Sequence, residues 1–321
     1  MITLEQRKEW FKEAKYGMMV HWGLYALLAG EWRGKRCPGI AEWIQHKLTI
    51  PVAEYDKLAS AFNPIYFDAE EMVKLAKDVG MQYIVVTSKH HEGFAMYHSK
   101  VDKFNVVDAT PFGRDVIGEI AEACYKHDLK LGLYYSQYLD WHEPHGGGFE
   151  GTGANYWDYP IEGRNYELCF RSKILPQVKE ILTQYGDLCL IWFDTPREMP
   201  EALSRELYDV VRTLQPACLV NSRISNTPGI GDYTSTRDNQ IPDDDKGNML
   251  WESPATINGT WGYKACDQNW KSPERILEIK RHLNERGINY LLNIGPDHLG
   301  RIPISSVEIL REVARLEKEE Q

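Results

Sequence analysis

The chain alternates short apolar runs with longer amphipathic segments along nearly its whole length. The runs are rich in β-branched and aromatic residues, which is typical of buried strands. They predict strands over 16–23, 83–91, 130–136, 188–194, 218–223, 248–253 and 289–295. The segments between them carry helical periodicity, and several have an Asp or Ser start signal and a Gly stop signal. They predict helices over 68–80, 115–129, 174–186, 200–216, 272–287 and 305–316.

This alternation of strand and helix predicts parallel strands joined by crossover helices. The continuous apolar character of the runs indicates strands that are buried on both faces. About seven or eight strands in one chain favour a (β/α)8-type barrel over an open doubly wound sheet. No GxGxxG or P-loop motif follows the first strand, which weakens the nucleotide-binding alternative. We therefore expect one somewhat irregular α/β barrel domain over residues 1–321, with a long functional or mobile loop from Leu139 to Asn165.

Composition narrows the classes of partner and cellular location. The 321 residues carry a formal net charge of −10 without a Lys/Arg block, so nucleic acid is not an expected partner. No apolar run reaches the length of a membrane span or of a signal-peptide core, so no membrane association is expected. None of the six cysteines forms a CxxC pair, and several lie in apolar runs, which predicts buried free thiols in a reducing cytoplasm.

Polar and aromatic side chains follow strand after strand. In a barrel of this class the active site lies at the carboxyl ends of the strands. An isolated Asp after a strand is usually a turn or helix cap, and that is the simplest interpretation of Asp194 in "LIWFDTP". Independent capping does not predict polar residues at so many strand ends, however. The strand-end residues are His21, Trp22, Lys89, His90, His91, Glu92, Tyr134, Tyr135, Ser136, Asp140, Trp141, Asp194, Asn221, Arg223, Trp251, Glu252 and Asn293.

The strand-end residues include the side-chain types that several kinds of active site use. His21, His90 and His91 suggest a metal site, but adjacent histidines on a strand point to opposite faces and no HxH or HExxH spacing is present. We therefore expect neither a metal nor another cofactor. A Ser/His/Asp triad lacks its GxSxG elbow. Paired carboxylates suit glycoside hydrolysis, with Asp194 as a nucleophile that Arg223 holds ionised and with aromatic side chains that stack on a sugar.

Five stretches carry a resemblance to a known family. They are "KYGMMVHWGLYAL", "FNPIYFDAEEMVKLAKDVGMQYIVVTSKHHEGFAMYHSKVDKFNV", "LGLYYSQYLDW", "LIWFD" and "NYLLNIGPD". Together they resemble the α-L-fucosidases of glycoside hydrolase family 29, and the run "SKHHEGFAMYHSK" is highly specific to that family. The resemblance covers roughly Trp10 to Val313. It implies a retaining exo-hydrolase on an irregular (β/α)8 barrel, which removes terminal α-L-fucose from oligosaccharides or glycoconjugates through a covalent fucosyl-enzyme.

The resemblance also implies roles for individual residues. Asp194 matches the family's nucleophile at the end of "WFD", and Arg223 matches an arginine near it. The residues that match the sugar-binding set are His21, His90 and His91 for the hydroxyls, the pair Glu42 and Trp43, Tyr134 (with Tyr135 as the neighbouring register), and Trp261 at the apolar face of fucose.

The acid/base is open between two carboxyls. Many family members carry a Glu in a "TPExxxP"-like segment, where this sequence has Asp238 in "TRDNQIP". Glu252 in "LWES" is the rival, although it could instead hold a neighbouring side chain. We favour Asp238, whose simplest alternative role is that of a solvated surface acid.

Two other function classes remain open at this stage. One is a fucose-binding protein without catalysis, since Asp replaces Glu at position 238. The other is a barrel glycosidase for a related sugar such as an α-L-galactoside or a β-D-arabinoside. Many relatives carry a β-sandwich after the barrel and this chain ends near the last barrel helix, so we expect a homo-oligomer in which a neighbouring subunit covers part of the rim.

Overall fold

The strands form one curled parallel sheet in which neighbours follow the order of the chain. The computed structural model describes residues 2–320. The eight-stranded sheet has the order β7-β6-β5-β4-β1-β10-β9-β8, and an isolated parallel bridge between Asn221 and Tyr233 links its two ends. The sheet thus curls into the expected irregular (β/α)8 barrel. Its strands are β1 (Tyr16–Val20), β4 (Tyr83–Lys89), β5 (Lys130–Ser136), β6 (Leu190–Asp194), β7 (Leu219–Val220), β8 (Thr234–Ser235), β9 (Trp251–Thr256) and β10 (Ile288–Ile294).

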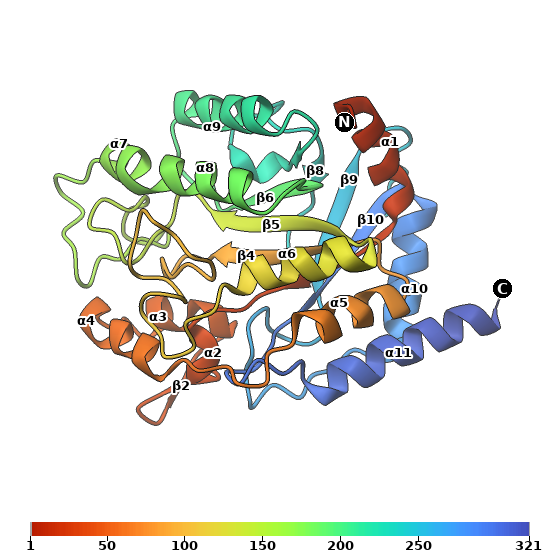
Figure 1. Cartoon of the computed structure of the whole chain (residues 1–321), viewed down its shortest axis with the longest axis horizontal. Helices are drawn as coiled ribbons and strands as arrows, with labels where there is room; N and C mark the ends of the chain where they lie inside the picture. Colours follow the sequence, from red (N-terminus) through yellow and green to blue (C-terminus); the bar gives the residue numbers. More distant parts are fainter. Residues whose placement is uncertain (1, 321) are drawn as a thin grey trace.

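Helices surround this sheet (Figure 1). Side-chain caps define several starts, because Asp68, Asp115 and Ser272 each accept a hydrogen bond from a backbone N–H of the first turn. The long helices are α1 (Leu4–Ala14), α5 (Ala69–Asp78), α6 (Val116–His127), α8 (Leu175–Gln184), α9 (Glu201–Leu214), α10 (Pro273–Glu285) and α11 (Ile304–Glu319). The short elements are α2 (Tyr25–Leu28), η1 (Ala41–Trp43), α3 (Ile44–Lys47), α4 (Val52–Tyr55), η2 (Asp56–Ala61), α7 (Tyr166–Cys169), η3 (Phe170–Ile174), η4 (Ser222–Ile224) and the hairpin of β2 (Glu31–Trp32) and β3 (Lys35–Arg36).

The alternation of side chains along each strand divides the apolar residues into two clusters. One cluster fills the barrel and includes Met19, Val85 and Trp192, while the other lies between strands and helices and includes Met18 and Phe193. The filling is tight, since a Cβ added at Gly17 would lie 2.5 Å from the Tyr83 ring. The interior is therefore a packed core, and ligand space is left only at its ends.

Most predicted elements are confirmed, and the exceptions lie between β7 and β9. The predicted strand 218–223 shortens to the two residues of β7, and η4 takes its second half. Strand β8 falls in a Gly/Asp-rich stretch that carries no strand pattern. Within residues 2–320, no α-helix separates β7 from β8 or β8 from β9. Without crossover helices, this side of the barrel lacks the alternation on which the prediction depends.

Strand direction places the loops that carry polar residues on one side of the barrel. The arrowheads of β4 and β5 point to the side where the α2–α4 segment and the long loop after β5 gather (Figure 1). Five of the six cysteines are buried free thiols, as predicted, but Cys266 is exposed. None of the helices between residues 2 and 320 combines the length and apolar character needed to cross a membrane.

Candidate active site

A small cavity lies at the carboxyl ends of the strands. Its volume is about 170 Å³. That is below the roughly 300–1,000 Å³ typical of pockets for drug-sized ligands, so the cavity suits one sugar ring. Most of the predicted site residues line it, and His91, Tyr134 and Glu252 lie behind its wall. The lining residues are His21, Ile40, Glu42, Trp43, His90, Trp192, Asp194, Thr195, Arg197, Arg223, Asp238 and Trp261.

Asp194 ends β6 with its carboxylate held on both oxygens. Arg223 Nη1 donates to Oδ1 over 3.0 Å, and the Tyr134 hydroxyl donates to Oδ2 over 2.9 Å. Tyr135 points away and donates to Gln177, so Tyr134 is the one of the two tyrosines that contacts Asp194. Burial raises the pKa of Asp194, but Arg223, His91 and Tyr134 together outweigh it and hold the pKa below its ordinary value. The carboxylate is therefore ionised at neutral pH.

Three histidines surround this carboxylate. His91 Nε2 lies 3.7 Å from Asp194 Oδ2, and the rings of His90 and His91 are 4.2 Å apart. The expectation that adjacent histidines face opposite sides is wrong here, because β4 ends at Lys89 after an irregular register and the strand pleat no longer applies. Burial is the main cause that lowers the pKa of His21 to about 4 and of His91 to about 3. His90 has a lowered pKa for the same reason. All three rings are neutral at pH 7.

Some nitrogens of these histidines lack a partner within the protein. His21 Nδ1 pairs with Asn293 Oδ1 over 2.7 Å, and His91 Nδ1 pairs with Ser136 Oγ over 2.6 Å. His90 Nδ1 and His91 Nε2, by contrast, are buried with no hydrogen-bond partner among residues 2–320. Because buried polar atoms normally find partners, these nitrogens indicate a place for polar groups of a ligand.

Glu42, Trp43 and Trp261 also line the cavity. The carboxylate of Glu42 accepts a hydrogen bond from the Gly262 N–H over 2.9 Å, which ties η1 to the loop after β9. Burial raises the pKa of Glu42 to about 7, although the Gly262 hydrogen bond opposes that rise. Trp43 packs edge-to-face against His91, and the rings of Trp261 and His21 are 5.2 Å apart. The predicted sugar-binding residues therefore come together from five separate parts of the chain.

Asp238 lies at the rim and shares a guanidinium with Asp194. Arg223 Nη2 donates to Asp238 Oδ1 over 2.6 Å while its Nη1 holds Asp194. The Asp238 side chain is 50% exposed, against 14% for Asp194. A retaining glycosidase needs two carboxyls about 5 Å apart, and two carboxyls on one guanidinium are close enough to suit that requirement.

Glu252 occupies a different place. Its oxygens accept hydrogen bonds from Tyr83 over 2.7 Å and from Trp192 Nε1 over 2.8 Å, and the residue is fully buried in the barrel. Burial raises its pKa to about 7, although these two hydrogen bonds oppose the rise. Glu252 is absent from the cavity lining.

Sequence reasoning missed four lining residues. Trp192 is one of them, and a usable signal existed, since it lies two residues before Asp194 and thus on the same face of β6. Ile40, Thr195 and Arg197 lie in loops, where no periodicity marks direction. Thr195 has a φ of 54°, which is unusual for a β-branched residue and marks a strained turn directly after Asp194.

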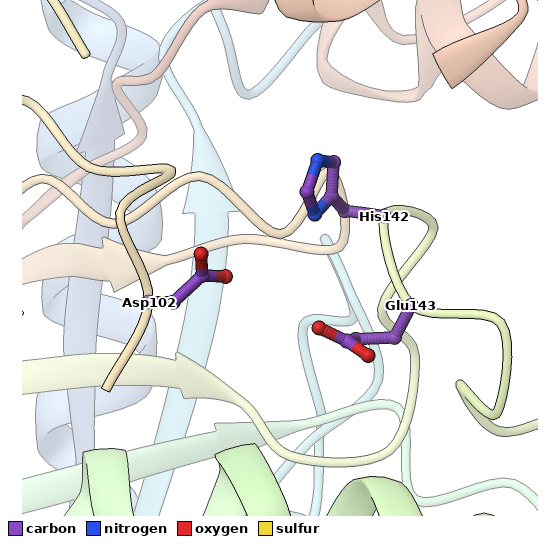
Figure 2. Close-up of side chains that lie close together, drawn as sticks. All are labelled: Asp102, His142 and Glu143. Atoms are coloured by element: carbon purple, nitrogen blue, oxygen red, sulfur yellow. The ribbon is translucent and has the colours of Figure 1, made fainter. Parts of the chain in front are cut away.

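A second polar group lies outside the cavity, behind the end of β4. Asp102, His142 and Glu143 face one another (Figure 2), with potential ligand atoms within 4.8 Å. The ammonium of Lys173 lies 2.6 Å from Asp102, 3.2 Å from Asp140 and 3.3 Å from Glu143. A lysine thus supplies the positive charge among these carboxylates. Lys89 also pairs with Asp140, over 2.8 Å. We name this group the lysine cluster: Lys89, Asp102, Asp140, Glu143 and Lys173.

Comparison with known proteins decides the family. The model of the family "Alpha-L-fucosidase" matches residues 2–319. The chain belongs to the alpha-L-fucosidase family. The predicted fold, family and alpha-L-fucosidase activity are therefore confirmed. Alpha-L-fucosidases are glycoside hydrolases.

Individual relatives of this alpha-L-fucosidase family show how much of each chain is shared. The alpha-L-fucosidase AlfC from Lactobacillus casei, solved with α-L-fucose product, is 56% identical with a TM-score of 0.93, and the match covers 98% of both chains. The alpha-L-fucosidase from Vibrio sp. strain EJY3 is 40% identical with a TM-score of 0.93 over 98% of this chain and 55% of its own. Tissue alpha-L-fucosidase of Mus musculus is 29% identical over 94% of this chain and 68% of its own length. The chain thus spans about two thirds of that curated relative.

Proposed function

We propose that this chain removes terminal α-L-fucose by a retaining double displacement, with Asp194 as nucleophile and Asp238 as acid/base. The observation that carries the proposal is the pair of carboxylates on Arg223, at one side of a cavity that suits a single sugar. Asp194 is ionised and held on both oxygens, as a nucleophile requires. Asp238 is the more exposed of the two, as suits a group that must reach both a leaving oxygen and a water.

In the first step Asp194 Oδ attacks the anomeric carbon while Asp238 donates a proton to the departing oxygen. The bond from carbon to the leaving oxygen breaks, and a fucosyl ester on Asp194 forms. In the second step Asp238 accepts a proton from water, whose oxygen attacks the same carbon and restores the carboxylate. Two inversions return the original configuration at the anomeric carbon.

Specificity follows from the polar and apolar walls. The neutral rings of His21 and His91 carry their proton on Nδ1, which is paired with Asn293 Oδ1 and Ser136 Oγ, so their Nε2 atoms can accept from sugar hydroxyls. The unpartnered His90 Nδ1 and His91 Nε2 gain partners when sugar binds. Ile40 and Trp261 offer apolar surface for the methyl group that distinguishes fucose from galactose. An α-L-galactoside would place a hydroxyl against that surface, so we expect a lower kcat/KM for it.

A relative suggests the linkage. A mutant of AlfC was solved in complex with Fuca(1,6)GlcNAc, and that chain is 55% identical to this one over 98% of both chains. We therefore propose that this chain accepts fucose linked α1,6 to N-acetylglucosamine. Release of fucose from that disaccharide, measured against the α1,2, α1,3 and α1,4 linkages, tests this substrate.

The role of each carboxyl is tested with an aryl α-L-fucoside and added azide. The Asp194→Gly variant should lose about 10⁴-fold or more in kcat, and azide should restore turnover as the β-fucosyl azide. Asp238→Gly should lose most of its activity on poor leaving groups, and azide should yield the α-fucosyl azide. Wild-type turnover that survives in Asp194→Gly without azide would reject the assignment.

We also propose a homo-oligomer in the cytoplasm. The free cysteines support a reducing location. Three exposed apolar residues, Ile65, Tyr66 and Ile304, line one groove of about 1,370 Å³, which supports contact with a second copy of this chain. Sedimentation of the wild type and of Tyr66→Glu tests this, since a monomeric wild type with full activity contradicts the oligomer.

A further inference from the structure

The floor below the cavity contains a buried carboxylate whose partners lead to the nucleophile. Glu252 on β9 has no exposed surface and accepts hydrogen bonds from Trp192 Nε1 and the Tyr83 hydroxyl. An indole N–H can only donate, so a carboxylate at this place fixes the direction of the Trp192 ring. The backbone of β6 fixes the other end of that side chain, two residues before Asp194.

Both side chains that hold Asp194 rest on this same indole. The Tyr134 ring stacks on Trp192 with centroids 5.6 Å apart and an interplanar angle of 16°. The Arg223 guanidinium lies over the Trp192 ring, 4.6 Å from its centroid. A rotation of the indole would therefore displace the hydroxyl on one Asp194 oxygen and the guanidinium on the other.

We infer that Glu252 is a positioning residue, which holds the Trp192 indole and, through it, the Tyr134 and Arg223 donors that orient Asp194. This inference rests on the proposed role of Asp194 as nucleophile. It assigns Glu252 to the geometry of attack and leaves proton transfer to Asp238.

The contacts of Glu252 argue against its rival role as general acid. A general acid must come within hydrogen-bond reach of the leaving oxygen. Both Glu252 partners lie in the barrel, and the Trp192 ring separates its carboxylate from the cavity that Trp192 lines. The two roles predict different sensitivities to the leaving group, because loss of an acid harms poor leaving groups selectively. Misplacement of the nucleophile harms every substrate to a similar degree.

Four variants test the inference on 4-nitrophenyl α-L-fucoside and on an alkyl α-L-fucoside. Glu252→Leu removes both acceptors, so kcat/KM should fall about 100-fold on both substrates, as for a small misplacement of reacting groups. Glu252→Gln keeps an acceptor for the indole, and both activities should stay within about tenfold of wild type. Trp192→Phe removes the N–H and should lower both activities in parallel. Tyr83→Phe removes the other donor, which has no contact with the Asp194 ligands, and should change activity only about two- to threefold.

A second readout isolates the nucleophile. Inactivation by 2-deoxy-2-fluoro-fucosyl fluoride traps the ester on Asp194 without help from an acid, and its rate should fall in Glu252→Leu by the same factor as kcat/KM. In the Trp192→Phe background, Glu252→Gln should add little, because the shared contact is already lost. If Glu252→Leu does not fold, the Glu252→Gln variant and this double-mutant comparison still decide the question.

Two outcomes would overturn the inference. One is a Glu252→Gln variant that loses the alkyl fucoside activity alone, which would make Glu252 the acid. The other is a folded Glu252→Leu variant with wild-type rates on both substrates. Failure of the underlying function is distinguishable, since the wild type would then release no nitrophenol before any variant is compared.

Discussion

The sugar cavity and the lysine cluster lie on two sides of the end of β4, and they differ in whether their buried polar groups are paired with other protein groups. Lys89 belongs to the cluster, whereas His90, the next residue, lines the cavity, and His91 lies behind the cavity wall with Nε2 3.7 Å from Asp194 Oδ2. In the cluster, two ammonium groups meet three carboxylates within 3.3 Å. At the cavity, His90 Nδ1 and His91 Nε2 have no hydrogen-bond partner among residues 2–320. Matched charges thus hold the loops of the cluster in place, whereas the two unpartnered histidine nitrogens lie where we propose that sugar binds.

The largest effect should come from the cluster and appear as stability. Lys173→Met leaves Asp140 and its neighbours with one ammonium fewer, so we expect the free energy of unfolding to fall by about 3–5 kcal/mol. The control is Lys12→Met, which breaks an exposed ion pair with Glu9. This variant should change the free energy of unfolding by about 0.5 kcal/mol or less. Urea titration of both variants measures the difference. Equal losses of unfolding free energy in the two variants would contradict a greater contribution of the buried cluster than of a surface ion pair.

The cavity should show the reverse behaviour. His90→Leu removes Nδ1, a buried nitrogen without a hydrogen-bond partner in the described part of the chain, so stability should stay level or rise while the hydrogen bond to sugar is lost. We expect kcat/KM for the aryl fucoside to fall about 10- to 100-fold. Paired measurements of kinetics and melting temperature check this. A His90→Leu variant with a much lower melting temperature and unchanged affinity for fucose would show that His90 has a structural role instead.

Acid should weaken the cavity through His21. Its pKa in the folded chain is lowered to about 4 by burial, so between pH 6.5 and 5 the unfolded chain binds a proton at this residue and the folded chain does not. The contribution of His21 to the free energy of unfolding is therefore fully present above pH 6.5. It decreases as the pH is lowered, and the loss reaches about 2 kcal/mol at pH 5. His21→Gln lacks this contribution, so the stability difference between wild type and variant should change by that amount between pH 7.5 and 5. A constant difference in urea titrations would contradict a buried neutral His21.

The smallest effect concerns thiol reactivity. Cys266 is exposed and should react at once with a thiol reagent in the native wild type, while buried Cys169 should not. Cys169 lies on α7, close enough to the cluster for Asp140 and Glu143 to add to the rise that burial gives its pKa. In Lys173→Met, local opening should make Cys169 react more slowly than Cys266 but faster than in wild type. Mass spectrometry of labelled peptides distinguishes the two sites.

The strand ends were the part of the site that sequence could predict. Asp194, His21 and Arg223 were expected because parallel strands deliver their carboxyl ends to one edge, and all three line the cavity. The lysine cluster was not foreseen, because Lys173 and Asp140 lie far apart in the sequence and meet only through the packing of a π-helical turn against the loop after β5. Arg197 was missed for a similar reason, since its direction depends on the strained turn at Thr195.

The two carboxyl candidates show what pattern reasoning leaves out. Asp238 and Glu252 were both plausible acids from their neighbours in sequence, yet one lies at the cavity rim and the other inside the barrel. Burial and hydrogen-bond partners depend on β8 and β9, and their register was the least predictable part of the barrel. The roles of both residues stay predictions that the variants above decide.

The short strands β7 and β8 have a consequence for how the molecule opens. Each has two residues, and among residues 2–320 no α-helix lies in the sequence between β7 and β9. Short strands give this part of the wall few ladder hydrogen bonds, so its backbone amides should exchange with solvent through local fluctuations rather than global unfolding. Asp194 ends β6, which pairs with β5 along its whole length and with β7 over two residues, whereas Asp238 follows β8, which pairs with β9 over two residues. We therefore expect the backbone around Asp194 to exchange more slowly than the backbone around Asp238, although Arg223 joins the two carboxyls.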